Sequence, residues 1–261
     1  MEIVSGIQQF ERAFAPYSDS FIVIGGSACR AVLSEGPILP RRTRDIDMVL
    51  VLEKVGRGFI GAFWNFIKEG GYKFARRKNV DDEEKYVFYS FVGGRQGYPS
   101  QIEILSKLVE GIGQPADYHV EYIETEEDYS HLSAIILDSD YYAYLTAHYI
   151  VRDGIRYASP DSLICLKSLA YMNLSADRIS GKQVNSDDLK KHRRDVMMAV
   201  ASLDPTESFE VSVNIKEVLN AFVQAIAEPQ ISQSLAASLG VGVDYLDSLV
   251  KIMQSSFITA R

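Results

Sequence analysis

Residues 21–28 read FIVIGGSA, and residues 42–50 read RTRDIDMVL. The first four residues, Phe21–Ile24, form a short apolar run of the kind that makes a buried strand. This run leads directly into Gly25-Gly26 and then into a helical pattern over residues 27–33. The second stretch starts an apolar run over residues 45–52 that is interrupted only by its two acids. The sequence therefore predicts a strand, a glycine turn and a helix, followed by a second, central strand.

Strand and helix patterns alternate up to residue 157, and helical patterns then continue almost without interruption to Arg261. Ser159 has the chemistry of an N-cap, with Pro160 at the first helical position. We therefore expect an α/β (α+β) fold with a mixed sheet over residues 1–157 and an all-α C-terminal domain over residues 158–261. The other expected strands are 72–75, 85–92, 101–105, 118–123 and 133–137. The other expected helices are 2–15, 59–68, 141–150, 160–174, 186–203, 213–227, 231–239 and 243–257.

The composition is that of an ordinary globular protein, which excludes disordered and fibrous classes. Of the 261 residues, 47% are hydrophobic and 24% are charged. Lys plus Arg number 27 against 35 Asp plus Glu, so the net charge is -8 and gives no general attraction to nucleic acid. A polyanionic partner would therefore need a local basic patch. The candidate clusters are Arg41, Arg42 and Arg44, then Arg76, Arg77 and Lys78, and then Lys190, Lys191, Arg193 and Arg194.

The cysteine pattern and the absence of long apolar runs predict a cytoplasmic protein with no membrane partner. The two cysteines, Cys29 and Cys165, lie far apart in apolar stretches, as expected in a reducing compartment. The sequence has no run of about 18 apolar residues. The N-terminal residues do not show the pattern of a secretory signal. The four histidines lack metal-ligand spacing and are assigned no role: His119, His131, His148 and His192.

The Gly25-Gly26-Ser27 turn is a candidate phosphate site. Two glycines let a phosphate approach the backbone closely, and a helix N-terminus offers unpaired N–H groups with a partial positive charge. Ser27 adds a hydroxyl donor. The alternative is a tight strand-to-helix turn that binds nothing.

Asp45 and Asp47 form a candidate metal site. Side chains at i and i+2 of a strand share one face, so the two carboxylates point the same way. Two like charges this close repel each other, and a divalent cation removes the conflict. Mg²⁺ is typically held by one or two carboxylates together with phosphates and water. The alternative is a pair of acids at the solvated end of a strand.

Glu103 is an acid inside an apolar strand, on the opposite face from Ile102 and Ile104. A buried carboxylate without a partner is costly, so Glu103 is expected to have one. It could be a third metal ligand or a general base that deprotonates an attacking hydroxyl. A structural salt bridge to Arg41, Arg42 or Arg44 is the other possibility.

Residues 25–28 and 42–50 together resemble the nucleotidyltransferase fold of the DNA polymerase β superfamily. The resemblance is to its AbiEii-like branch, the bacterial toxins of type IV toxin–antitoxin systems. The superfamily pattern is a Gly-Gly-Ser or Gly-Gly-Thr turn, a variable loop, an Asp-x-Asp at a strand start and a later strand with one carboxylate. The resemblance implies that Asp45, Asp47 and Glu103 are catalytic and bind Mg²⁺ (or Mn²⁺). It also implies that Gly25, Gly26, Ser27 and Lys167 bind the nucleotide triphosphate.

Two segments of the helical half are similar to the same branch. Lys167 lies on an apolar helix face, where a lysine must either snorkel or meet an anion. The resemblance implies that this lysine approaches the active-site phosphates. Residues 187–196, DDLKKHRRDV, are similar to the final motif of the branch, whose charged positions face the cleft. The alternative for these residues is a solvated, salt-bridged helix face.

The sequence thus predicts an enzyme that transfers NMP from an NTP such as ATP to a hydroxyl. The resemblance implies an RNA (tRNA) or protein acceptor, toxin-like action and an antitoxin as a further partner. The competing hypothesis is a degenerate member of the fold that binds nucleotide or a partner protein without turnover. The three carboxylates favour the enzyme.

Overall fold

The computed structural model describes residues 6–77, 87–106, 122–125 and 138–259. Lys78, the predicted strand over 133–137 and most of the predicted strand over 118–123 lie outside these residues. Two compact units are present, and each is built from separated parts of the sequence. The first takes its described residues from Met1–Ala28, Arg42–Leu137 and Tyr149–Tyr157. The second takes them from Cys29–Arg41, Asp138–His148 and Ala158–Arg261, whereas the sequence prediction divides the chain only at residue 157.

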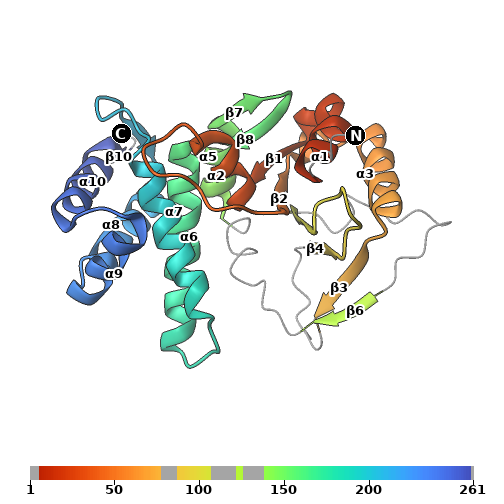
Figure 1. Cartoon of the computed structure of the whole chain (residues 1–261). Helices are drawn as coiled ribbons and strands as arrows, with labels where there is room; N and C mark the ends of the chain where they lie inside the picture. Colours follow the sequence, from red (N-terminus) through yellow and green to blue (C-terminus); the bar gives the residue numbers. More distant parts are fainter. Residues whose placement is uncertain (1–5, 78–86, 107–121, 126–137, 260–261) are drawn as a thin grey trace. The chain divides into compact units, whose positions relative to one another are not determined.

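The protein is α/β, with a mixed sheet, as expected. Within the described residues the sheet has eight strands in the order β6-β3-β4-β5-β2-β1-β8-β7. Most of these strands are labelled in Figure 1. β2 runs parallel to β5 and antiparallel to β1, and β1 runs parallel to β8. The bounds are β1 Phe21–Ile24, β2 Asp45–Leu50, β3 Lys73–Arg77, β4 Val87–Val92, β5 Gln101–Ser106, β6 Tyr122–Thr125, β7 Tyr149–Arg152 and β8 Ile155–Ala158.

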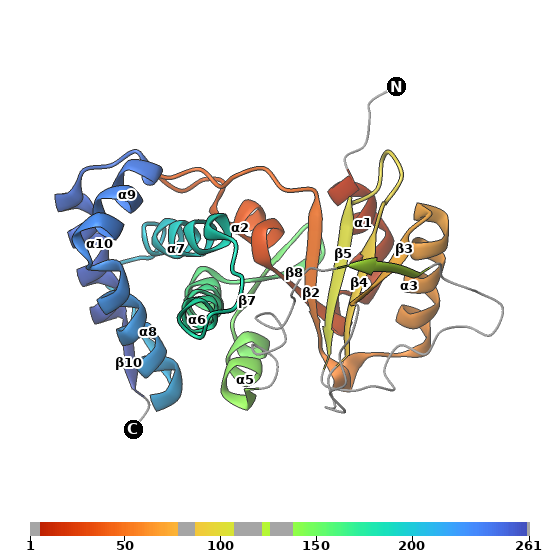
Figure 2. The ribbon, with the colours of Figure 1, turned by 90° about the horizontal axis from the view of Figure 1, so that it is seen from below.

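An aromatic layer fixes α1 (Gly6–Phe14) and α3 (Arg57–Gly70) to one face of the sheet (Figure 2). Phe14 of α1 lies 6.0 Å from Phe21 of β1, centroid to centroid, and Phe63 of α3 lies 5.4 Å from Phe91 of β4. All four rings are almost completely buried. Two short 3-10 segments, η1 (Ala15–Ser20) and η2 (Leu52–Lys54), flank β1 and β2 in the chain. This packing determines which face of each central strand carries the aromatic side chains. Because side chains alternate along a strand, the residues between them point to the opposite face of the sheet.

The second unit is mainly helical. Its helices are α5 (Ser139–Ala147), α6 (Pro160–Ile179), α7 (Ser186–Val200), α8 (Val213–Ile226), α9 (Pro229–Leu239) and α10 (Val243–Ser256), joined by most of α2 (Gly25–Leu33). α6 packs against α7 and α8, and α7 packs against α9 and α10. None of the helices in the described part of the chain is long and apolar enough to cross a membrane.

The expectation of an all-α C-terminal domain is wrong in one respect. β9 (Phe209–Val211) and β10 (Phe257–Thr259) form a two-stranded parallel sheet. Phe209 and Phe257 are paired in register, and their rings lie 5.5 Å apart. The predicted helix over 243–257 therefore ends one residue early, at Ser256. These strands are three residues long, too short for a period-2 pattern to emerge from the sequence.

The predicted helix over 141–150 extends too far at its C-terminal end. α5 ends at Ala147, and Tyr149 starts a hairpin formed by β7 and β8. Asp153 and Gly154 at its turn have φ angles of 50° and 76°. Two central residues with positive φ match the twist of a hairpin, and Asp-Gly is a strong signal for this turn. The Asp-Gly pair is visible in the sequence, but the helical spacing of the residues before it favoured a longer helix.

Candidate active site

The three predicted carboxylates lie on one face of the sheet, opposite the aromatic layer. Asp47 of β2 is paired in register with Glu103 of β5. The row continues to Ile24 of β1 on one side and to Ser90 of β4 on the other. Residues in register on neighbouring strands point to the same face, and Asp45 shares that face with Asp47. The strand register therefore places the three acids on one face of the sheet.

Glu103 is buried, with 6% of its surface exposed, and its polar partners are Gln101 on its own strand and Asp47 on β2. Gln101 donates a hydrogen bond of 2.6 Å from Nε2 to Glu103 Oε1 and also reaches Ser90 Oγ at 3.2 Å. Burial, followed by the charge of Asp47 and a hydrogen bond to Asp47, raises the pKa of Glu103 to about 9. Glu103 therefore holds a proton at neutral pH and shares it with Asp47. Glu103 is therefore paired with another carboxyl group. Within the described residues it makes no salt bridge to an arginine, which was the alternative that the sequence left open.

This proton makes stability depend on pH. The pKa of Glu103 is about 9 in the folded chain against an ordinary value of 4.5, so between these values the folded state binds a proton that the unfolded state has lost. In metal-free buffer, the Glu103 contribution to the free energy of unfolding should therefore fall as pH rises from 4.5 to 9, by at most about 1.4 kcal/mol per pH unit. Urea unfolding of wild type and Glu103→Gln at about pH 5.5, 7 and 8.5 measures this contribution. The free energy of unfolding of the variant should increase relative to that of wild type as pH rises. A difference that stays constant with pH would show that Glu103 is ionised in the folded protein.

Gly25 brings the backbone at the start of α2 against the Asp47 carboxylate. Its φ is +66°, in the left-handed region, and a Cβ at this position would lie 1.9 Å from Asp47 Oδ2. No side chain fits there without displacing Asp47. The glycine that was predicted to admit a phosphate therefore has a second, structural role, because it lets the helix terminus reach the carboxylate.

Gly25→Ala should destabilise the protein by about 2 kcal/mol or more, because it combines left-handed strain with a clash against Asp47. Gly61→Ala is the matched control. Gly61 lies inside α3 with nothing within 4 Å of a built Cβ, so alanine should stabilise it by about 0.5–1 kcal/mol. Urea unfolding of both variants decides the matter. Equal effects of the two substitutions would contradict the contact with Asp47.

Ser27 fastens α2 to β2. Its hydroxyl is buried and donates to the main-chain carbonyl oxygen of Asp45. The side chain therefore sets the distance between the glycine turn and the first aspartate. The hydroxyl proton is committed to this bond, so the donors left for an anion at this turn are the first N–H groups of α2, which have no partner inside the helix.

A metal ion would have to be accommodated by rearrangement of these carboxylates. In the part of the chain that the structure describes, no three histidine, cysteine, aspartate or glutamate side chains are placed to hold a metal as they stand. The donor set itself fits Mg²⁺, which prefers carboxylate oxygens. Loss of the Glu103 proton would leave three anionic groups on one face, and a divalent cation is the usual partner for such a group.

Lys167 meets an anion within its own unit. It is buried in α6, and its Nζ lies 2.8 Å from Asp195 Oδ2 of α7, which is also buried. Burial lowers the pKa of Lys167, but the charge of Asp195, the nearby Cys29 and the hydrogen bond to Asp195 together raise it by more, so the pKa lies above its usual range. The lysine therefore stays charged. Its predicted approach to nucleotide phosphates stays a prediction.

Cys29 belongs to the same neighbourhood as this ion pair, and burial raises the pKa of its thiol to about 12. Burial also raises the pKa of Cys165 well above its usual value. Both thiols are therefore protonated at neutral pH and unreactive. Both cysteines are free and buried.

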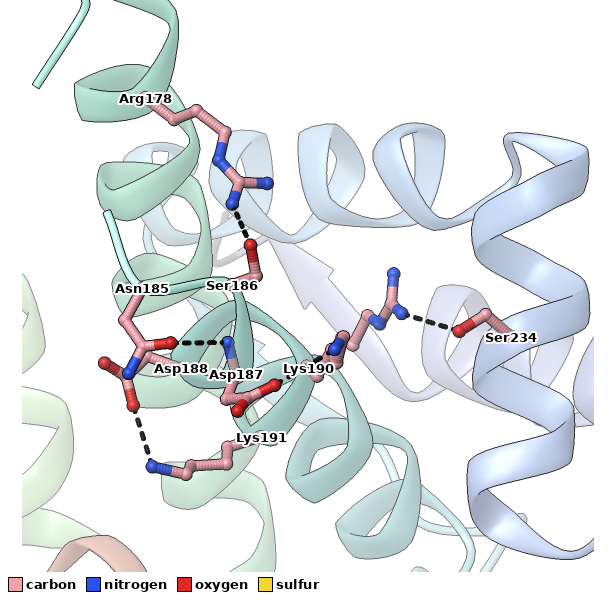
Figure 3. A network of polar contacts seen from close by, with 9 residues as sticks. Arg178, Asn185, Ser186, Asp187, Asp188, Lys190, Lys191 and Ser234 are labelled. Atoms are coloured by element: carbon pink, nitrogen blue, oxygen red, sulfur yellow. Dashed lines mark hydrogen bonds and ion pairs between the residues drawn. The ribbon is translucent and has the colours of Figure 1, made fainter. Parts of the chain in front are cut away.

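The first part of the charged run, residues 187–191, forms a salt-bridged helix face (Figure 3). Asn185 caps α7 by accepting from Asp187 N at 2.9 Å. Lys190 pairs with Asp187 at 3.0 Å, and Lys191 pairs with Asp188 at 2.8 Å. Of the two alternatives left open by the sequence, this part of the run has the salt-bridged one. Exposed pairs of this kind are weak, so a polyanion could still displace the acids.

The remaining basic residues of the predicted clusters lie in several different elements. Arg193 is buried and donates to Ser234 Oγ at 3.0 Å. Arg194 donates to Ser238 O and Leu39 O, each at 3.2 Å, and so ties α7 to the segment before Arg41. Arg76 and Arg77 lie in β3, and Lys78 is outside the described residues. Arg42 and Arg44 belong to the first unit and Arg41 to the second.

Comparisons with protein families, with curated proteins and with solved structures each find no match for this chain.

Two residues of the site were missed by the sequence reasoning. Gln101 donates to the Glu103 carboxyl group, and Ser90 accepts a second hydrogen bond from Gln101. Gln101 could have been found, because it precedes Glu103 by two residues and therefore shares its face of the strand. Ser90 could not, because the pairing of β4 with β5 depends on a turn and register that the sequence leaves open.

Proposed function

We propose that this chain is a nucleotidyltransferase that moves NMP from an NTP to a hydroxyl of an RNA or protein acceptor and releases pyrophosphate. The observation that carries the proposal is the Asp47–Glu103 pair. Two carboxyl groups lie in register on adjacent parallel strands, beside Asp45 and against the glycine at the start of α2. Carboxylates that attract a cation, placed beside a helix terminus that attracts an anion, are suited to a metal-bound phosphate ester.

The arrangement of elements supports a fold of the DNA polymerase β type. β1 leads through Gly25-Gly26 into α2, the neighbouring β2 starts with Asp45 and Asp47, and β5 carries the third carboxylate. The order of these elements along the chain agrees with the pattern of the resemblance. The acids of the site come from two strands that are adjacent only in the folded sheet.

Each residue has a distinct role in the proposed reaction. Asp45, Asp47 and Glu103 would hold Mg²⁺ or Mn²⁺, which when bound neutralises charge on the phosphates and on the departing pyrophosphate. The main-chain N–H groups of Gly26 and Ser27 would orient the phosphates at the start of α2. Glu103 would release its proton on loading of the site, and its carboxylate would then either complete the donor set or accept the proton of the attacking hydroxyl. Gln101 would keep the Glu103 carboxyl group oriented throughout.

Label transfer tests this proposal. The full chain is incubated with each α-phosphate-labelled NTP in turn, with Mg²⁺ or Mn²⁺, total RNA and a cell lysate. Transfer of label to RNA or to a protein band, dependent on the metal, is the expected result. Bound nucleotide with no transfer to any acceptor would favour the degenerate binding protein. If neither binding nor transfer occurs with any NTP, the proposal is wrong.

A further inference from the structure

A second polar cluster lies within the second unit, where α5 ends and α6 begins, and it is independent of the carboxylate site. His148 is the C-cap residue of α5, and Asp161 is in the first turn of α6. His148 Nδ1 lies 2.7 Å from Asp161 Oδ2. Asp161 is buried, whereas about a third of the His148 side chain, 34%, is exposed. The pair is thus a buried carboxylate behind a solvent-accessible imidazole.

Both the imidazole ring and the main chain of His148 are held in place. Its ring stacks on Tyr144, with centroids 4.0 Å apart and planes inclined by 15°. Ser159 and Ser162 donate hydrogen bonds of 2.9 and 2.7 Å to the main-chain oxygen of His148. A side chain fixed in this way loses little further freedom when its free atom reacts.

The hydrogen bonds also assign the tautomer. Tyr144 donates its hydroxyl proton to Asp161 Oδ2 at 2.7 Å, the same oxygen that faces His148 Nδ1. Burial, with smaller contributions from Cys165 and Asp161, raises the pKa of Tyr144 above its usual range, so its hydroxyl stays protonated. An ionised carboxylate only accepts hydrogen bonds, so Nδ1 carries the second proton. In the neutral ring the lone pair is therefore on Nε2.

The hydrogen-bonded series from Tyr144 through Asp161 to His148 ends at Nε2. A Ser–His–Asp arrangement would place a hydroxyl at Nε2. Here Ser159 and Ser162 donate to a main-chain oxygen instead, and Tyr144 donates to Asp161. Among the described residues, none is hydrogen-bonded to Nε2. The imidazole itself is therefore the last group of the series, which favours a nucleophile over a base that activates a neighbouring hydroxyl.

We propose that His148 Nε2 is a nucleophile that accepts a phosphoryl group from a small dissolved donor, an acyl phosphate or a phosphoramidate. The Nε2 lone pair forms an N–P bond, and the bond from phosphorus to the acyl oxygen or to the amine nitrogen breaks. The electrons of that bond leave with the carboxylate or the amine, and the Nδ1 proton stays on the ring, hydrogen-bonded to Asp161. The positive charge that develops on the ring is stabilised by Asp161 and by the C-terminal end of α5.

Phosphoramidate and acetyl phosphate are the probes. The full chain is treated with each, and the acid-labile phosphohistidine is assigned by 31P NMR and peptide mapping. His148 should react about 10-fold or more faster than N-acetylhistidine under the same conditions, because the ring is held in one orientation and Asp161 stabilises the positive charge that develops on it. Asp161→Asn should reduce this rate to that of the free compound. His148→Gln should abolish the signal, and His192→Gln, the matched control, should leave it unchanged.

The wild-type rate alone can overturn the proposal. If His148 stays unmodified, or reacts no faster than N-acetylhistidine, Nε2 is not an activated nucleophile. Because this comparison needs no variant, the test survives even if Asp161→Asn does not fold, which circular dichroism would reveal. Label at His192 in place of His148 would also contradict the proposal. The outcome does not depend on whether the chain transfers nucleotides.

Discussion

Asp47→Asn should lower the rate of nucleotide transfer by about 100-fold or more, the typical loss when one electrostatic group is removed from an active site. Asparagine keeps the size of the side chain and leaves an oxygen that can accept the hydrogen bond from Glu103. It removes the negative charge that the proposed metal site requires. The fold should therefore persist while metal-dependent transfer is lost.

The same substitution should stabilise the metal-free protein. The charge of Asp47 is the second largest cause, after burial, of the raised pKa of Glu103. Without it, the repulsion between the two carboxyl groups disappears. The melting temperature in EDTA at about pH 8 should rise relative to wild type. Gain of stability together with loss of activity is the signature of charges that are kept close for function.

Two measurements on one preparation check this prediction. Transfer of α-phosphate label is followed at saturating Mg²⁺, and thermal unfolding is followed in EDTA. Asp244→Asn is the matched control, since Asp244 is exposed in α10, and it should change neither quantity. An Asp47→Asn variant that keeps wild-type transfer would remove Asp47 from the catalytic group. A variant that loses both activity and stability would mean that the carboxylate is structural.

The sequence predicted the parts of the site that follow from strand periodicity. Asp45 and Asp47 had to share a face because their spacing is two, and Glu103 had to oppose Ile102 and Ile104 for the same reason. These local rules hold whatever the topology of the sheet. They also gave the mixed α/β class, because the helical and strand periods are distinct over the first 70 residues.

The sequence could not predict which groups meet across strands and helices. The register that sets Asp47 beside Glu103 joins residues separated by a long stretch of chain. The clash that fixes Gly25 as glycine comes from a side chain on another strand. The pairing of Lys190 and Lys191 with their own helix's acids depends on rotamers, which a one-dimensional charge pattern leaves open. Pair geometry of this kind depends on tertiary packing rather than on local propensity.

Lys167→Met should destabilise the second unit by about 3–5 kcal/mol, the usual cost of breaking a buried ion pair from one side. The substitution leaves Asp195 as an uncompensated charge that is only 2% exposed. Asp195→Asn should have a comparable effect, because it leaves a buried ammonium group. Urea unfolding measures both losses, and Lys190→Met, an exposed lysine on α7, is the control that should change little.

The double variant Lys167→Met/Asp195→Leu separates the structural role of Lys167 from a role in nucleotide binding. Both charges are gone, so most of the lost stability should return. If Lys167 also holds phosphates, as the resemblance implies, the double variant should unfold like wild type yet bind NTP about 10-fold or more weakly, the loss expected for one charge-assisted contact. Equal NTP affinity for the two proteins would confine Lys167 to packing α6 against α7. If the double variant remained as unstable as Lys167→Met, the loss of stability would come from poorer packing of the core and not from the unpaired charge.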